Sequence, residues 1–208
     1  MLSYGRAELV ERISGIPRYI VCGRVTKRPV FAFISRLIRP NDALQVFLFE
    51  DDYSFGVLQS GMHWEWFTAR CSTLKGDFRY TSNTVFDSFP WPQSPTQRQI
   101  SETAAAAVFL RDVRSRVMHE NNWSLRDLYR TLELPGRSAL KDAHAALDAA
   151  VRAAYGMRGK SSALEFLLKL NMELSAQEAA DKSITGPGLR SLTKDNHRFI
   201  TSDCVEPR

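Results

Sequence analysis

The sequence predicts an α+β protein: a mixed β-sheet half-domain with flanking helices, followed by a small all-α helical bundle. Between residues 18 and 50, runs of β-branched and aromatic residues are separated by turn residues, which is typical of strands. After residue 94, apolar residues recur at spacings of three and four behind capping residues, which is typical of helices joined by short loops. The chain has 208 residues, 44% of them hydrophobic, which is enough for one large domain or two small ones with a real core.

The first half is expected to contain a short helix, three strands and a longer helix. Residues 6–13 form the short helix, with Gly15 as the residue that ends it. The strands are expected at 18–25, 29–38 and 44–50, with turns between them. The pair Asp51-Asp52 then starts an amphipathic helix over 53–70.

The stretch from Thr73 to Pro92 joins the two halves, and its first part is expected to be one strand. A period of two places Lys75, Asp77 and Arg79 on one face, with Phe78 and Tyr80 on the other. Lysine can pair with guanine O6 and N7, and a carboxylate accepts a hydrogen bond from the N4 amino group of cytosine. A solvated strand face without any ligand explains the same pattern.

Four helices are expected after this junction. A capping box that starts at Ser94 opens the first, which runs to about residue 118, and Ser124 caps a short second one. The third runs from Ser138 to Gly156, and Ser162 caps the fourth. The expected division is a half-domain over 1–93, a bundle over 94–182 and a polar, loosely held tail over 183–208.

Charge is unevenly distributed along the chain. The net charge is +5 and the isoelectric point is near 9.3, which fits a polyanionic partner without requiring one. The run from residue 18 to residue 39 contains six cations and no acidic residue: Arg18, Arg24, Lys27, Arg28, Arg36 and Arg39. A phosphate-facing surface explains this run about as well as solubility does.

The sequence contains no pattern that specifies catalysis. It has no glycine-rich phosphate loop, no nucleophile elbow and no paired-histidine metal motif. The three cysteines are widely spaced, which favours free thiols, no metal site and a reducing cytoplasm. His63 and His144 are expected to be packed in the core, although a free-standing enzyme built on His63 and Glu65 stays open as an alternative.

Three strings carry a resemblance to a known family. They are RYIVCGRVTKRPVFAFIS from residue 18, IRPNDALQVFLFEDDYSFGVLQSGMHWEW from residue 38, and TLKGDFRYTSNTVFDSFPWP from residue 73. They resemble the later part of the target-recognition domain in MmeI-like type II restriction–modification enzymes. LRDLYRTL, AHAALDAAVRAAYG and LEFLLKLN are similar to the C-terminal helical region of that family and of related phage-defence DNA methyltransferases.

The resemblance implies a role in sequence-specific recognition of duplex DNA. It also implies a longer prokaryotic parent chain, with an adenine-N6 methyltransferase domain that uses S-adenosylmethionine and an endonuclease that uses Mg²⁺. The motifs of those domains are absent from these 208 residues, so the chain is expected to start within the recognition domain and to have no catalytic residue or cofactor of its own. Its implied partners are double-stranded DNA and the parent's methyltransferase domain.

The resemblance also assigns roles to residues. Lys75 and Asp77 match positions that vary with the base pair read, and their combination suits a G·C pair. Arg79 and Tyr80 match positions that hardly vary, so they are expected to fix the strand or to meet phosphate. A second reading segment falls on Arg39, Asn41 and Asp42. The expected phosphate contacts are Arg18, Arg24, Lys27, Arg28, Arg36, Arg79 and Tyr80. The alternative is a protein-interaction module without DNA sequence specificity.

Overall fold

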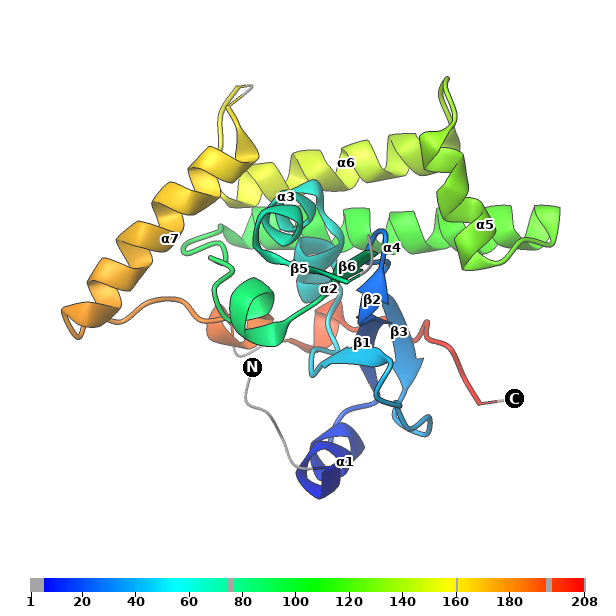
Figure 1. Cartoon of the computed structure of the whole chain (residues 1–208), viewed down its shortest axis with the longest axis horizontal. Helices are drawn as coiled ribbons and strands as arrows, with labels where there is room; N and C mark the ends of the chain where they lie inside the picture. The colour runs from blue at the N-terminus through cyan, green and yellow to red at the C-terminus, as the bar shows by residue number, and fades with distance from the viewer. Residues whose placement is uncertain (1–5, 75–76, 160, 194–195, 208) are drawn as a thin grey trace.

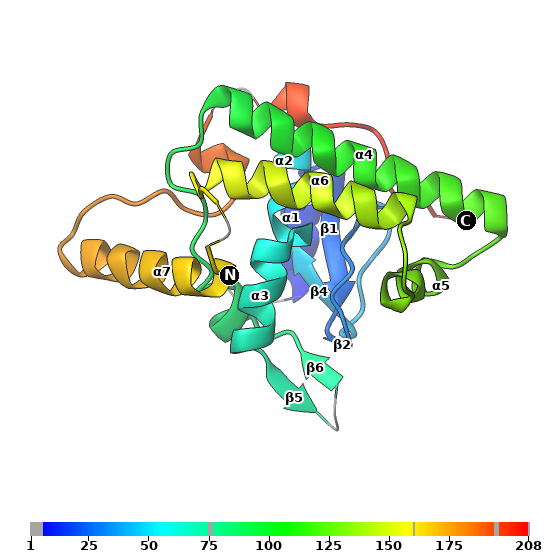
Figure 2. The ribbon, with the colours of Figure 1, turned by 90° about the horizontal axis from the view of Figure 1, so that it is seen from above.

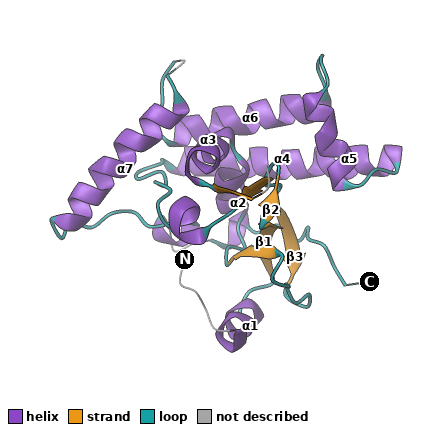
Figure 3. Cartoon of the chain, in the orientation of Figure 1, coloured by secondary structure: helices purple, strands orange, loops and turns teal. Residues whose placement is uncertain are grey.

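The computed structural model describes residues 6–74, 77–159, 161–193 and 196–207. Two small antiparallel sheets lie beside a set of helices, so the predicted α+β class is confirmed (Figure 3). The helices are α1 (Arg6–Ser14), α2 (Asp52–Gln59), α3 (Gly61–Arg70), α4 (Gln97–Asn121), α5 (Leu125–Arg130), α6 (Ala139–Ala154) and α7 (Ala163–Ala179), with shorter helical turns η1 (Ser82–Phe86), η2 (Thr131–Glu133), η3 (Leu189–Ser191) and η4 (His197–Phe199). No helix in the described ranges is both long enough and apolar enough to cross a membrane.

The first sheet has the strand order β3-β1-β4, formed by β1 (Arg18–Gly23), β3 (Ala32–Ser35) and β4 (Leu44–Phe47). Central β1 pairs antiparallel with both neighbours, with Ile20 opposite Phe33 on one side and Phe47 on the other. These β-branched and aromatic residues are buried, because one face of the sheet packs against α2 and the helices behind it.

The second sheet has the order β2-β6-β5, formed by β2 (Val25–Thr26), β5 (Ser72–Leu74) and β6 (Asp77–Arg79). Leu74 pairs with Asp77 and Ser72 with Arg79. Residues 73–80 are therefore a hairpin and not the single strand that the sequence predicted. The hairpin projects beyond the end of α3, away from α4 and α6 (Figure 2). Lys75 lies outside the described residues.

Two of the expected helices have different limits in the structure. The helix predicted over 53–70 is two helices, because Ser60 ends α2 and its hydroxyl accepts from the His63 N–H to start α3. The first helix of the second half starts from a capping box of Thr96 and Gln99, two residues later than the one predicted at Ser94. The caps predicted at Ser124 and Ser162 are confirmed, and Ser138, the expected start of the third helix, is the N-cap of α6.

The long helices α4 and α6 lie side by side across the back of the molecule (Figures 1 and 2). Helix α7 leaves this layer and packs against α3 of the first half. One apolar cluster contains buried residues from both halves, including Trp66, Phe89 and Leu147. The predicted packed junction at 89–92 is confirmed, since Phe89 and Trp91 are each 4% exposed and Tyr155 donates to the Pro90 carbonyl at 2.8 Å.

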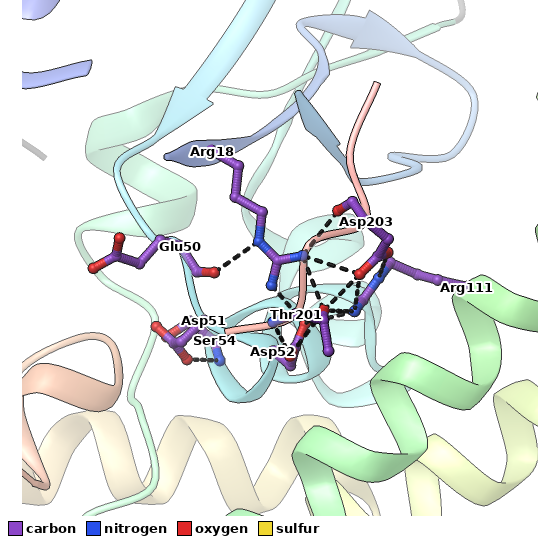
Figure 4. A network of polar contacts seen from close by, with 8 residues as sticks. All are labelled: Arg18, Glu50, Asp51, Asp52, Ser54, Arg111, Thr201 and Asp203. Atoms are coloured by element: carbon purple, nitrogen blue, oxygen red, sulfur yellow. Dashed lines mark hydrogen bonds and ion pairs between the residues drawn. The ribbon is translucent and has the colours of Figure 1, made fainter. Parts of the chain in front are cut away.

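The segment after residue 183 is not the loosely held tail that its polar composition predicted. Leu189 and Phe199 are buried in the main core. Val205 continues along β3, because its N–H donates to the Phe33 carbonyl and its carbonyl accepts from the Ser35 N–H, both at 2.9 Å. Asp203 joins a buried polar network with Arg18 and Arg111 (Figure 4).

Candidate nucleic-acid interface

Strand β6 presents two different faces, as its alternating sequence predicted. Phe78 packs between Trp64 and Phe67, with ring centroids 6.1 and 5.7 Å away. The opposite face carries Asp77, which is half buried, and Arg79, which is exposed. The aromatic face therefore fixes β6 on α3 and leaves the charged face available to a ligand.

A cleft of about 550 Å³ separates this charged face and the turn after β2 from helix α5. Its charged residues are four cations and two carboxylates: Lys27, Arg28, Arg126, Arg130, Asp77 and Glu133. Two of the cations come from the first half of the chain and two from α5. The cleft thus has an excess of positive charge contributed by both halves, which suits a polyanion.

The turn at one wall of the cleft is held by its own side chains. The Thr26 hydroxyl donates to the Arg28 carbonyl at 2.8 Å and accepts from the Arg28 N–H at 3.2 Å. The Arg28 guanidinium lies 5.1 Å from the Trp64 ring centroid, a cation–π distance. Arg28 is therefore held in place before any ligand binds.

Tyr129 of α5 lies at the floor of the cleft and is held by buried partners. Arg114 donates to the Tyr129 hydroxyl and, at 2.9 Å, to the Phe31 carbonyl. The Tyr129 hydroxyl lies 3.0 Å from His144 Nε2. Burial, together with the charges of Arg114 and Arg28, lowers the pKa of His144 to about 3, so this histidine is neutral and accepts from the tyrosine hydroxyl.

Two residues expected to contact phosphate lie in the interior, and this corrects the prediction for them. Arg18 is 1% exposed and pairs with Asp52 at 2.8 Å, so a carboxylate inside the protein compensates its charge (Figure 4). Tyr80 is also 1% exposed, and its hydroxyl bonds His63 Nε2 at 2.9 Å. Tyr80 therefore fixes the strand, which is one of the two roles expected for it.

The expected second reading segment is exposed, and backbone hydrogen bonds made by Arg24 connect it to the end of β6. Arg39, Asn41 and Asp42 are exposed in the connection between β3 and β4. The Asn41 carboxamide oxygen accepts a hydrogen bond from the Ala43 N–H at 3.1 Å. Part of the hydrogen-bonding capacity of Asn41 therefore stabilises the local turn. The Ala43 carbonyl accepts from the Arg24 N–H, and the Arg24 carbonyl accepts from the Tyr80 N–H, both at 2.8 Å. Arg24 thus joins the two segments.

The basic run of the sequence does not form one surface. Arg36 lies beside the beginning of β1, where its N–H donates to the Pro17 carbonyl. Lys27 and Arg28 lie beyond the other end of β1, and a strand of six residues is roughly 20 Å long. Lys27 and Arg36 are both exposed, but they lie near opposite ends of β1.

His63 does not form a catalytic pair with Glu65. His63 is fully buried while Glu65 is exposed. Burial lowers the pKa of His63 to about 3, and Nε2 bonds the Tyr80 hydroxyl, so the ring is a neutral part of the core. Within the part of the chain that the structure describes, no cluster of His, Cys, Asp or Glu could hold a metal ion.

Sequence reasoning did not select Arg126 and Arg130. They are four residues apart on α5, a spacing that places both side chains on one helix face. The available signal was a pair of arginines, one inside the capping box of Ser124 and Asp127 and the other three residues after it. The sequence could not indicate that the turn after β2 lies opposite these two arginines, on the other side of the cleft.

Comparison with known proteins identifies two domains in this chain. The family model "MmeI, target recognition domain" matches residues 19–93, and "MmeI, C-terminal domain" matches residues 93–178. The chain belongs to the MmeI family and contains these two domains.

Two relatives agree with this assignment. The chain is 35% identical over 126 residues to "DNA methyltransferase A" of Bacillus subtilis (strain 168), a match that covers 59% of this chain and 14% of the relative. It is also similar to the structure of the type IIL restriction–modification enzyme MmeI in complex with DNA, with a TM-score of 0.68 and 27% identity, covering 76% of this chain and 21% of that one. The chain therefore spans less than a quarter of either relative.

Proposed function

We propose that this chain recognises duplex DNA as the target-reading part of a restriction–modification methyltransferase. The observation that carries the proposal is the likeness to MmeI, whose structure is described in complex with DNA and which shares 27% identity over 76% of this chain. The charged face of β6 and the cationic cleft beside it are the surface that we assign to the duplex. Catalysis belongs, in this proposal, to other domains of a longer protein.

The reading element in this proposal is the β5–β6 hairpin, which enters the major groove. A two-stranded ribbon fits that groove, where each base pair presents a distinct pattern of donors and acceptors. Asp77 sits at the start of β6, on the face opposite the aromatic anchor, and Lys75 lies two residues earlier in the sequence. Asp77 accepts from the cytosine amino group, and Lys75 donates to guanine of the same pair.

We further propose that the longer protein is an adenine-N6 methyltransferase that uses S-adenosylmethionine, and that an attached endonuclease would use Mg²⁺. The name of the Bacillus relative supports the first part of this statement. The methyltransferase domain of the same longer chain is then the second partner, and base recognition by this chain would orient that domain on the DNA.

The proposal is tested by selecting from a randomised duplex library with the 208-residue chain at low ionic strength, where phosphate contacts are strongest. We expect one sequence motif to be enriched. Asp77→Ala and Lys75→Ala should each lose roughly 1–3 kcal/mol of discrimination at the same base pair. Glu102→Ala, an exposed carboxylate at the start of α4, is the matched control and should leave the motif unchanged. Binding without any enriched motif would contradict sequence reading and favour a module without DNA specificity.

A further inference from the structure

We propose that helix α5 and the turn after β2 together bind the DNA phosphodiester backbone, so that the C-terminal domain contacts the duplex directly. The residues that carry this second contact are Arg126 and Arg130 on one side of the cleft and Lys27 and Arg28 on the other. The inference rests on the proposed function and extends it, because it gives the helical half a binding role separate from base reading.

The first argument is that these cations lack strong internal partners. Within the described ranges, no ion pair is formed by Lys27, Arg28 or Arg126. Arg130 lies 3.7 Å from Asp127 on its own helix, and both side chains are about half exposed or more, so this pair is weak. The four charges are therefore available to an anion.

The second argument is the buried cation behind the cleft. Arg114 is 5% exposed, and its partners among the described residues are neutral: the Phe31 carbonyl and the Tyr129 hydroxyl. Its Nε is buried without a hydrogen-bond partner in the described structure. A buried charge that no carboxylate compensates is costly, and an anion in the adjoining cleft would reduce that cost.

The third argument is the position of the cleft relative to the reading strand. Asp77 lines the same cleft as Arg126 and Arg130. A major groove is about 12 Å wide and is bordered by a phosphate strand on each side, so an element that reads base edges has backbone phosphates next to it. With β6 in the groove, one phosphate strand passes along the mouth of the cleft, beside α5.

The test compares two variants of the 208-residue chain that each lose two positive charges. The cleft variant is Arg126→Ala with Arg130→Ala, and the control is Arg98→Ala with Lys169→Ala. Arg98 and Lys169 are exposed, with side chains 86% and 80% accessible, and lie at the start of α4 and on α7, away from α5. Fluorescence anisotropy would measure affinity for a duplex enriched from the library and for a scrambled duplex, each over a range of salt concentrations.

We expect the cleft variant to lose roughly three- to tenfold affinity per arginine on both duplexes, with its salt dependence reduced by about one unit of slope per phosphate contact. Base preference and the control variant should be unchanged. A conservative variant, Arg126→Lys with Arg130→Lys, should regain most of the affinity because phosphate accepts a point charge.

Three results would overturn the inference, and they are distinguishable from failure of the proposed function. Unchanged binding by the cleft variant, or an equal loss in the control, would remove α5 from the interface while wild-type specificity still supported DNA reading. A loss confined to the enriched duplex would make the arginines base readers. No binding of any duplex by the wild type would reject both proposals.

Discussion

Asp52 is the residue on which the buried polar network converges. Its side chain is 2% exposed, and it pairs with Arg18 at 2.8 Å and with Arg111 at 2.5 Å (Figure 4). The Thr201 hydroxyl lies 3.0 Å from the same carboxylate oxygen. One carboxylate therefore compensates two buried guanidinium groups and ties the C-terminal segment to α2, β1 and α4.

Removing this carboxylate should destabilise the protein strongly. Asp52→Ala leaves two buried cations with Asp203 as their remaining carboxylate, and we expect a loss of about 3–5 kcal/mol in the free energy of unfolding. Urea unfolding measures it. The control is Asp142→Ala, which removes an exposed carboxylate 3.3 Å from Arg137 and should cost less than about 1 kcal/mol. Equal costs would mean that the network contributes no more than a surface ion pair.

His63 predicts a pH dependence of stability. Burial lowers its pKa from 6.5 to about 3 in the folded protein, so below pH 6.5 the unfolded chain binds a proton that the folded protein does not. Its contribution to stability is therefore complete above pH 6.5 and is lost as the pH falls toward 3. The loss is about 1.4 kcal/mol per pH unit within this window.

The comparison that isolates this effect is wild type against His63→Gln, each unfolded in urea between pH 7.5 and 5. Other groups titrate in both proteins, so the difference between them reports the histidine alone. We expect the wild type's advantage to shrink as the pH is lowered. Parallel curves would show that His63 becomes protonated without unfolding.

At the scale of elements, the C-terminal segment pairs with the edge of β3 through one β-bridge at Val205. Burial raises the pKa of Asp203, but hydrogen bonds from Arg111 and Thr201 and the charges of Arg111 and Arg18 outweigh it and lower the value to about 2. The segment is thus held by a charged anchor at Asp203 and by the two backbone hydrogen bonds of Val205.

Asp203→Ala should release this segment while the sheet remains. Because the Asp203 side chain is 47% exposed, we expect a modest loss of about 1–2 kcal/mol. Hydrogen exchange should accelerate at the Ser35 and Val205 amides, and the amides that pair β1 with β4 should remain protected. Uniform acceleration across the sheet would instead indicate global destabilisation.

The sequence predicted whether a segment is a helix or a strand better than it predicted the residues at which the segment begins and ends. The caps at Ser124 and Ser162 were predicted correctly, because capping is a local interaction. The hairpin was missed because the alternation of 75, 77 and 79 in the sequence is continuous, whereas in the structure Leu74 pairs with Asp77.

The features that could not be predicted from the sequence depend on contacts between residues far apart in the chain. The basic run from residue 18 to residue 39 was interpreted as one surface. Arg18, however, is buried and pairs with Asp52 and Asp203, which are 34 and 185 residues away in the chain. The segment after 183 was taken for a tail because its few apolar residues have no period, and Leu189 is buried by packing that the local sequence does not encode. The strand face that carries Asp77 could be predicted because period two is local, whereas the cleft that Asp77 lines also needs α5.

At the scale of the whole molecule, the two family domains share one core. The cluster that contains Phe47, Trp66 and Phe89 continues through Ala107 and Leu147 of α4 and α6. Arg111 of α4 bonds Asp52 of α2, and Tyr155 bonds the Pro90 carbonyl. Separating the domains would expose this apolar surface and leave buried charges unpaired, so neither is expected to be stable alone.

A shared core predicts one cooperative unfolding transition, and the chain offers two probes that distinguish its halves. Three of the four tryptophans, Trp64, Trp66 and Trp91, lie in the first half. Helices α4, α6 and α7, which contribute most of the far-ultraviolet circular dichroism, lie in the second. Fluorescence and circular dichroism should therefore give the same urea midpoint. The same coincidence should persist in Asp52→Ala at a lower midpoint, because the network joins both halves. Two separated midpoints in the wild type would mean that the domains fold independently and that the interface between them, including the cleft, is not fixed by the fold.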